Sequence, residues 1–297
     1  MIIESKGQIH DNLYAIGSSE FPGYLLKGKR PVLFDAGMTF MGPLYLVELE
    51  NLLGDINSLA FHFLTHSHFD HAGASPFLKR SIPGLKIGAS PEAAETFRKP
   101  NAIELIKNLS RSLEEKNSAL IGGADVTFNG LEIDLVLSDG MEIELADGLV
   151  CRVIATPGHT RDSLSFYIPK MKAIITGEAI GAFDRNFTIH PEFTSSYQDY
   201  MASLEKLAAL DIEIILMCHY FTLTGADARG YMQKAIMGAQ AFKERIEHYL
   251  MNANGDRQAV VKKIFQEDYE ATGAILQDSR PYLINLDAKV RVVAEVR

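Results

Sequence analysis

Three histidines and one aspartate stand within six residues of this chain. They are His66, His68, Asp70 and His71, and they directly follow the apolar segment 59–64. Neutral imidazoles and carboxylates are the ligands that zinc, iron and manganese accept in proteins. A polar loop without a metal has no reason to hold four such groups at fixed spacing where a buried strand ends. The sequence therefore predicts a metal site at residues 66–71.

The spacing within this motif indicates two ions rather than one. In extended backbone, alternate side chains point to the same side, so His66 and His68 can share one ion. Asp70 and His71 come after the chain must turn, and the small residues 72–74 allow tight packing there. We therefore expect Asp70 and His71 to serve a second ion beside the first.

Two ions need about six or seven protein donors, because a catalytic zinc takes about three ligands and keeps one open position. Three further candidates each follow a predicted buried strand: His159 after 150–155, Glu178 after 173–176, and His219 after 212–218. The carboxylate of Glu178 could bridge the two ions. Four strands that end at ligands would place the whole site on one rim of the fold, where the sheets hold the loops rigidly.

The order of these motifs resembles the metal-binding signature of the metallo-β-lactamase-fold hydrolases. The resemblance extends from about residue 10 to 225. It rests on His66-Ser-His68-Phe-Asp70-His71, Gly158-His159-Thr160, Gly177-Glu178, His219 and the strand Leu33-Phe34-Asp35-Ala36-Gly37. Several segments, among them Gly177 to Asp184, are similar to a thioesterase-like branch of the superfamily from bacterial signalling.

The resemblance implies an α/β fold, an αββα sandwich, with a C-terminal helical extension. It implies the following ligands: His66, His68 and His159 on one ion, Asp70, His71 and His219 on the other, and Glu178 between them. The common pattern has aspartate at position 178, and glutamate adds one methylene, which bears on metal identity and spacing. Asp35 is a candidate to hydrogen-bond a ligand histidine and fix its tautomer.

The expected activity is hydrolysis of a small ester or thioester, with an acyl-CoA-type thioester preferred. Two divalent ions, zinc or iron or manganese, would supply a bridging hydroxide as the nucleophile. Asp70 would hold its ion and could pass a proton to the leaving group. One alternative is an acyl-homoserine lactonase, although those enzymes carry a tyrosine where this chain has Gly181. Another is a regulatory protein with a mainly structural metal site.

Composition favours a small-molecule substrate and excludes a nucleic-acid partner. The 297 residues carry a net charge of −9, and no basic cluster is present that would offset the phosphates of a polyanion. No apolar run is long enough to span a bilayer, and the start of the chain lacks the pattern of a signal peptide. We expect a cytoplasmic enzyme without a membrane partner, for which a homodimer is allowed. Cys151 and Cys218 lie in apolar strands and are expected to be buried thiols.

The remaining patterns predict one catalytic domain, 1–225, followed by a helical extension, 226–297, that caps the active site. Strands are expected at 13–16, 23–26, 31–34 and 131–136, and helices at 43–53, 74–80, 226–251 and 258–269. Three histidines, His62, His190 and His248, are not assigned to the site. His62 is expected to be a packed strand residue.

Overall fold

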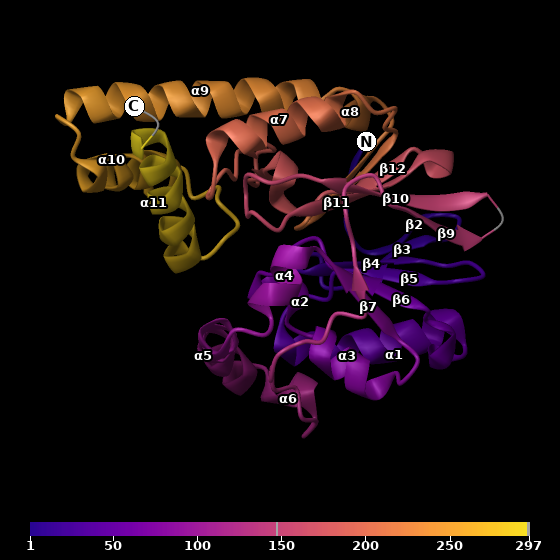
Figure 1. The fold of residues 1–297 in the computed structure, drawn as a ribbon. Coiled ribbons are helices and arrows are strands. Elements are labelled where there is room, and N and C mark those ends of the chain that lie inside the picture. Colours follow the sequence, from indigo (N-terminus) through magenta and orange to yellow (C-terminus); the bar gives the residue numbers. More distant parts are fainter. Residues whose placement is uncertain (147, 296–297) are drawn as a thin grey trace. The chain divides into compact units, whose positions relative to one another are not determined.

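The chain folds into two compact units that are interleaved along the sequence. The structure is a computed structural model that describes residues 1–146 and 148–295 (Figure 1). Unit 1 comprises Met1–Ala155, Asp162–Gly177 and Ile212–Gly225. Unit 2 comprises Thr156–Arg161, Glu178–Asp211 and the chain from Ala226 onward. The expected division between 225 and 226 is therefore one of several crossings between the units.

Unit 1 contains two seven-stranded sheets. The first, the N-terminal sheet, has its strands in sequence order: β2 (Gly7–His10), β3 (Leu13–Gly17), β4 (Pro22–Leu26), β5 (Val32–Phe34), β6 (Phe61–Phe63), β7 (Lys86–Ala89) and β8 (Leu135–Val136). Its early strands are antiparallel, whereas β5, β6, β7 and β8 are parallel neighbours. Parallel neighbours need crossover connections, which here contain helices and loops.

The second sheet of unit 1 collects strands from both ends of the chain. Its order is β1 (Ile2–Glu4), β16 (Phe221–Thr224), β15 (Ile214–Leu216), β12 (Ala173–Ile175), β11 (Leu164–Ile168), β10 (Leu149–Ala155) and β9 (Glu142–Ala146). Strand β11 is antiparallel to both β10 and β12, and β12 is parallel to β15. Strands β10, β12 and β15 therefore run in one direction and end at the same edge of the sheet.

One hydrophobic core of unit 1 lies between these two sheets, and another lies between the N-terminal sheet and its helices. Phe34 and Phe63 of the N-terminal sheet contact Phe166 of the second sheet, with ring centroids 5.1 and 5.7 Å apart. The hydroxyl of Tyr24 donates a hydrogen bond across the sandwich to the carbonyl of Met217 at 2.6 Å. The sandwich is thereby joined by aromatic packing and by a buried polar contact.

The other face of the N-terminal sheet packs against helices. Successive strand residues point to opposite faces, so Leu25 and Leu33 face the helices while their neighbours enter the sandwich. Figure 1 shows α1 (Gly42–Leu53) and α3 (Ser75–Ser81) beneath this sheet. Unit 1 also contains these short or peripheral helices: η1 (Thr39–Met41), η2 (Ile56–Ser58), α2 (Phe69–Ala72), α4 (Pro91–Thr96), α5 (Pro100–Lys116), α6 (Ser118–Ile121) and η3 (Pro169–Met171).

Unit 2 is mostly helical. Its elements are β13 (Ala182–Phe183), β14 (Ile189–His190), α7 (Tyr197–Ala208), α8 (Ala226–Arg229), α9 (Tyr231–Asn252), α10 (Arg257–Ile264), the π-helix η5 (Phe265–Glu270) and α11 (Ser279–Glu295). The short helix η4 (Gly177–Ile180) begins at the junction of the two units. None of the described helices combines the length and the apolar character that a bilayer crossing requires.

The α/β class, the two-sheet architecture and the C-terminal helices are as predicted, and three local expectations needed correction. The expected helix 226–251 is divided at Gly230 into α8 and α9. The strand expected over 131–136 forms only at β8, because Leu131 and Ile133 are buried in the helix-side core and take no part in the ladder. The expected helix 258–269 continues beyond α10 as a π-helix, and α11 lies within the predicted helical extension, where no separate helix had been placed.

Candidate metal centre

The histidine-rich motif follows the central strand β6 of the N-terminal sheet. The chain leaves β6 at Phe63 and remains extended at His68, which immediately precedes α2. The imidazole centroid of His66 lies 4.6 Å from that of His68 and 4.3 Å from that of His71. His66 and His71 are almost fully buried. The three rings are therefore gathered at one place after the end of the strand.

His219 joins the second half of the motif from the loop between β15 and β16. Its Nε2 lies 3.9 Å from Oδ2 of Asp70, and Nε2 of His71 lies 4.0 Å from the same oxygen. Ligand atoms bind zinc at about 2.0–2.2 Å, so one ion can touch two atoms at these separations. Asp70, His71 and His219 each offer a ligand atom within 4.8 Å of the others. This donor set fits a divalent ion.

Asp35 anchors the ligand residues of unit 1 from the end of β5. Its Oδ1 accepts the backbone N–H of Thr65 at 2.8 Å, and its Oδ2 accepts the Thr65 hydroxyl at 2.7 Å. The same Oδ2 lies 3.0 Å from Nδ1 of His71. Asp35 has a φ of +53°, a left-handed conformation that aspartate tolerates better than most residues. Three hydrogen bonds account for a carboxylate that is almost completely buried.

Hydrogen bonding at Nδ1 fixes the tautomer of three histidines in unit 1. The acceptor-only carboxylate of Asp35 requires a proton on Nδ1 of His71. The backbone carbonyl of Glu20 lies 2.6 Å from Nδ1 of His219 and likewise requires a proton on that nitrogen. Nδ1 of His66 lies 3.0 Å from the Thr65 hydroxyl, whose own hydrogen goes to Asp35. In each ring Nε2 therefore keeps the lone pair that a metal ligand needs.

Two further candidate ligands, His159 and Glu178, belong to unit 2. Nε2 of His159 lies 3.8 Å from Oε2 of Glu178, and both side chains are buried. The backbone carbonyl of Glu192 accepts a hydrogen bond from Nδ1 of His159 at 2.8 Å, so Nε2 again carries the lone pair. An imidazole and a carboxylate at this separation could also touch one ion.

The loop that presents His159 has no room for a side chain at Gly158. Gly158 has a φ of +135°, and a Cβ there would lie 2.4 Å from Cα of Tyr200. The carbonyl of Gly158 accepts the backbone N–H of Ser195 at 3.0 Å, and the carbonyl of His159 accepts the Thr194 hydroxyl at 2.6 Å. The turn at Pro157 and Gly158 therefore packs closely against segment 194–200.

The histidines left out of the predicted site have other partners. His62 is fully buried, with Nε2 2.8 Å from the Ser75 hydroxyl and Nδ1 3.2 Å from the carbonyl of Leu33. Burial lowers the pKa of His62 to about 4, so the ring is neutral near pH 7. His190 pairs with Asp184 at 3.2 Å. The prediction that His62 is a packed strand residue is confirmed.

Several residues that hold the candidate ligands were not found by sequence analysis. Thr65 adjoins the motif and could have been suspected from its position. The carbonyls of Glu20 and Glu192 have no sequence signal, because every residue carries a backbone carbonyl. Neither Cys151 nor Cys218 forms a disulfide, and both are buried, as expected.

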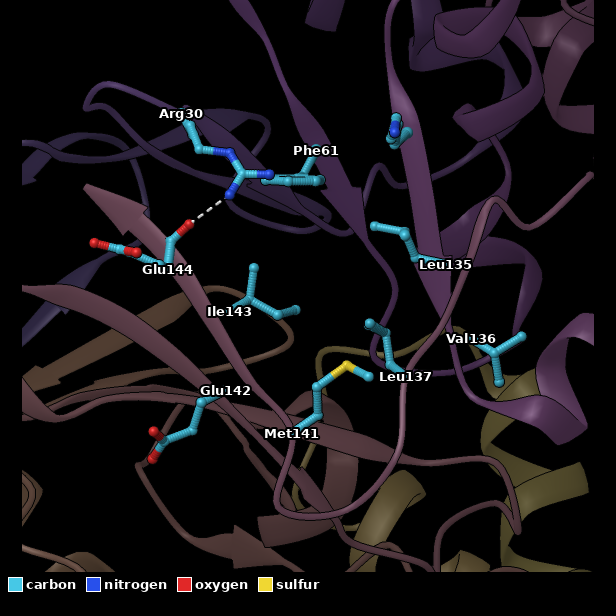
Figure 2. A pocket seen from close by; sticks show the side chains of 10 residues that line it. Arg30, Phe61, Leu135, Val136, Leu137, Met141, Glu142, Ile143 and Glu144 are labelled. Atoms are coloured by element: carbon cyan, nitrogen blue, oxygen red, sulfur yellow. Dashed lines mark hydrogen bonds between the residues drawn. The ribbon is translucent and has the colours of Figure 1, made fainter. Parts of the chain in front are cut away.

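A separate hollow of about 300 Å³ lies between β8 and β9 of unit 1 (Figure 2). The hollow is lined by Leu135, Leu137, Met141 and Ile143. At one side the guanidinium of Arg30 lies over the ring of Phe61 and donates a hydrogen bond to the carbonyl of Glu144 at 2.9 Å. None of the candidate ligands lines this hollow. It is therefore not the substrate pocket that the metal ligands would serve.

The chain matches one family model and a group of curated proteins. The sequence profile described as the Metallo-beta-lactamase superfamily matches residues 23–219. Hydroxyacylglutathione hydrolase of Brucella ovis is 28% identical over 170 residues, which are 57% of this chain and 51% of that protein. The chain thus spans about half the length of the curated relatives that it matches.

Solved structures share the fold at low sequence identity. A metallo-beta-lactamase family protein from Thermus thermophilus has a TM-score of 0.64 at 20% identity, covering 98% of this chain and 91% of that chain. An archaeal metallo-beta-lactamase superfamily protein from Sulfolobus tokodaii has a TM-score of 0.59 at 19% identity, covering 96% and 99%. At these identities the similarity establishes the fold alone.

Proposed function

This chain belongs to the metallo-beta-lactamase superfamily, and on that premise we propose that it is a dinuclear-metal-dependent hydrolase of a small thioester or ester. An acyl-CoA-type thioester is the preferred substrate class. The observation that carries the proposal is the common presentation of Nε2 by His66, His71, His159 and His219. Four imidazoles that are independently held in the metal-binding tautomer are not expected in a metal-free protein.

The proposed ligands are the seven residues predicted from the sequence. The ligands are His66, His68 and His159 for one ion, Asp70, His71 and His219 for the other, and Glu178 as the bridge. The separations within each unit, 3.8 to 4.0 Å, support these groupings. The donors are imidazoles and carboxylates without a thiolate, which suits zinc and also iron or manganese. When bound, two such ions lower the pKa of a water to about 7 and polarise a carbonyl.

The residues of the chain position the reaction and handle its proton. Attack of a water on the thioester carbonyl forms a carbon–oxygen bond, breaks the carbon–sulfur bond and releases a carboxylate and a thiol. One proton of the water goes to the leaving sulfur, and the other is released to solvent when the product acid ionises. We assign the first transfer to Asp70, whose Oδ2 lies beside His71 and His219. Asp35 keeps the His71 ring in its metal-binding orientation.

The thioester class is supported by the curated relatives, whose name describes hydrolysis of a hydroxyacylglutathione, itself a thioester. A lactonase of the kind that carries tyrosine at position 181 is disfavoured. Gly181 has a φ of +84°, and a Cβ there would lie 2.6 Å from the carbonyl oxygen of His190. A bulky side chain cannot enter this backbone without displacing segment 189–190.

The test is thiol release by the purified full chain after loading with zinc, manganese or iron. Substrates are a hydroxyacylglutathione and a series of acyl-CoA thioesters, with an acyl-homoserine lactone as the competing class. The matched control to a His66→Ala variant is His248→Ala, because His248 is exposed on α9 and contacts Asn252. We expect turnover by the wild type and by His248→Ala only. Failure of every metal-loaded form to release thiol would refute the thioester proposal.

A further inference from the structure

We infer that Lys289, near the C-terminal end of unit 2, is a positioning residue for the candidate ligand His159 and acts through Glu192. All three residues belong to unit 2. Lys289 lies on α11, within the predicted helical extension. The inference rests on the proposed metal centre and gives the C-terminal helix a role in ligand geometry.

Lys289 and Glu192 form a buried ion pair. The Lys289 Nζ lies 2.9 Å from Oε1 of Glu192, and it also donates to the carbonyl of Pro191 at 3.1 Å. Lys289 is only 2% exposed and Glu192 only 7%. The rings of Phe242 and Tyr282 flank the ammonium at 5.8 and 5.9 Å. Lysine is almost never buried to this degree unless it is paired, so the contact is specific.

Hydrogen bonds hold both the backbone N–H and the backbone carbonyl of Glu192. Its N–H donates to the hydroxyl of Tyr200 at 3.3 Å, and its carbonyl accepts Nδ1–H of His159 at 2.8 Å. Tyr200 is itself buried in α7. The Glu192 carbonyl also accepts the backbone N–H of Thr194 at 3.1 Å. The direction of the carbonyl therefore depends on four contacts, of which the Lys289 ion pair is the one that carries charge.

Removal of Lys289 would leave the Glu192 carboxylate buried without its cation. A buried charge that loses its partner is strongly unfavourable, so segment 191–192 would rearrange to bring the carboxylate to water. The Glu192 carbonyl would move with it and would no longer hold the His159 ring. Loss of the group that orients a ligand histidine typically weakens metal binding by about 10-fold to 100-fold.

The experiment measures zinc binding to the metal-free full chain by competition with a chromogenic chelator, together with the visible absorption of the Co²⁺-substituted protein. We expect Lys289→Met to bind one of two zinc ions about 10-fold to 100-fold more weakly and to have an altered Co²⁺ spectrum. Lys289→Arg should recover most of the affinity. The matched control is Arg291→Met, which removes an exposed cation from the same helix and should bind zinc like the wild type.

The outcomes separate this inference from the proposed function. If the wild type holds no zinc, the proposed metal centre fails. If the wild type binds two zinc ions and Lys289→Met binds them within about threefold, with an unchanged Co²⁺ spectrum, Lys289 is only structural and the inference is wrong. If Lys289→Met does not fold, the double variant Lys289→Met with Glu192→Gln decides, because it buries no unpaired charge. Its zinc affinity should still fall by more than threefold, and a smaller loss overturns the inference.

Discussion

The two units hold their candidate ligand histidines by different means. In unit 1, His71 is oriented by the side chain of Asp35, which lies at the end of a central strand and also binds Thr65. In unit 2, His159 is oriented by the backbone carbonyl of Glu192, in a segment without regular structure that is tied to Lys289. A strand end takes its rigidity from the sheet, whereas a loop ligand needs a separate anchor. The contrast predicts that the two ligand sets respond differently to substitution.

Substitution of a ligand itself should have the largest effect on activity. The loss of activity should be similar for ligands of the two units, but the loss of thermal stability should differ. We expect His71→Ala and His159→Ala each to lower thiol release by about 10³-fold or more. His71→Ala also takes a donor from the buried Asp35 carboxylate, whereas His159→Ala takes one only from a carbonyl. In thermal unfolding of the metal-free proteins, His71→Ala should therefore be the less stable variant. Equal melting temperatures would contradict the difference between the units.

Gly158→Ala should destabilise unit 2 by about 3 kcal/mol, because a Cβ would overlap the backbone of Tyr200. The matched control is Gly54→Ala in unit 1. Gly54 also has a positive φ, of +78°, but a Cβ there meets no atom within 4 Å. The control should cost only about 1 kcal/mol. Urea denaturation measures the free energy of unfolding of both variants. Equal losses would show that the backbone around Gly158 can move to accept a Cβ.

Asp35→Asn tests the anchor of unit 1. Asparagine fits the left-handed backbone at position 35, so the change removes the charge with little added strain. The amide cannot accept from all three present donors, so we expect zinc affinity to fall by about 10-fold to 100-fold. Asp55→Asn, at an exposed carboxylate of the same unit, serves as the control. Unchanged zinc affinity in Asp35→Asn would show that the sheet alone positions His71.

His62→Gln tests whether the buried His62 makes the stability of the protein depend on pH. Burial lowers the pKa of His62 from 6.5 to about 4, so the folded state favours the neutral ring. The contribution of neutral His62 to the free energy of unfolding is fully present above pH 6.5 and is lost as the pH falls toward 4. Between pH 7 and 4.5 the free energy of unfolding of the metal-free wild type should fall by about 2 kcal/mol more than that of His62→Gln. Parallel pH profiles would contradict a neutral buried His62.

The residues that orient the ligand histidines differ in how well they can be predicted from the sequence. The Asp-x-Gly segment at residues 35–37 marked Asp35 as a candidate partner, because a carboxylate at a strand end has few other roles. Glu192 could not be found in this way, since its carbonyl is used and a carbonyl is common to all residues. The ion pair that fixes it joins residues 97 positions apart, and no local pattern records such a distance. The bounds of α11 within the predicted helical extension were missed for a related reason, because the apolar face of residues 279–295 is recognised only when it packs.

Local sequence patterns were enough to predict the types and order of the candidate ligands, the strands that precede them and the α/β class. These features follow from side-chain chemistry and from local periodicity, which are written along the chain. The folded chain was needed to find which groups orient each ligand, that unit 2 includes segments 156–161 and 178–211, and that Lys289 is buried against Glu192. Those features depend on contacts between distant residues, whose free energies are settled only when the whole chain packs.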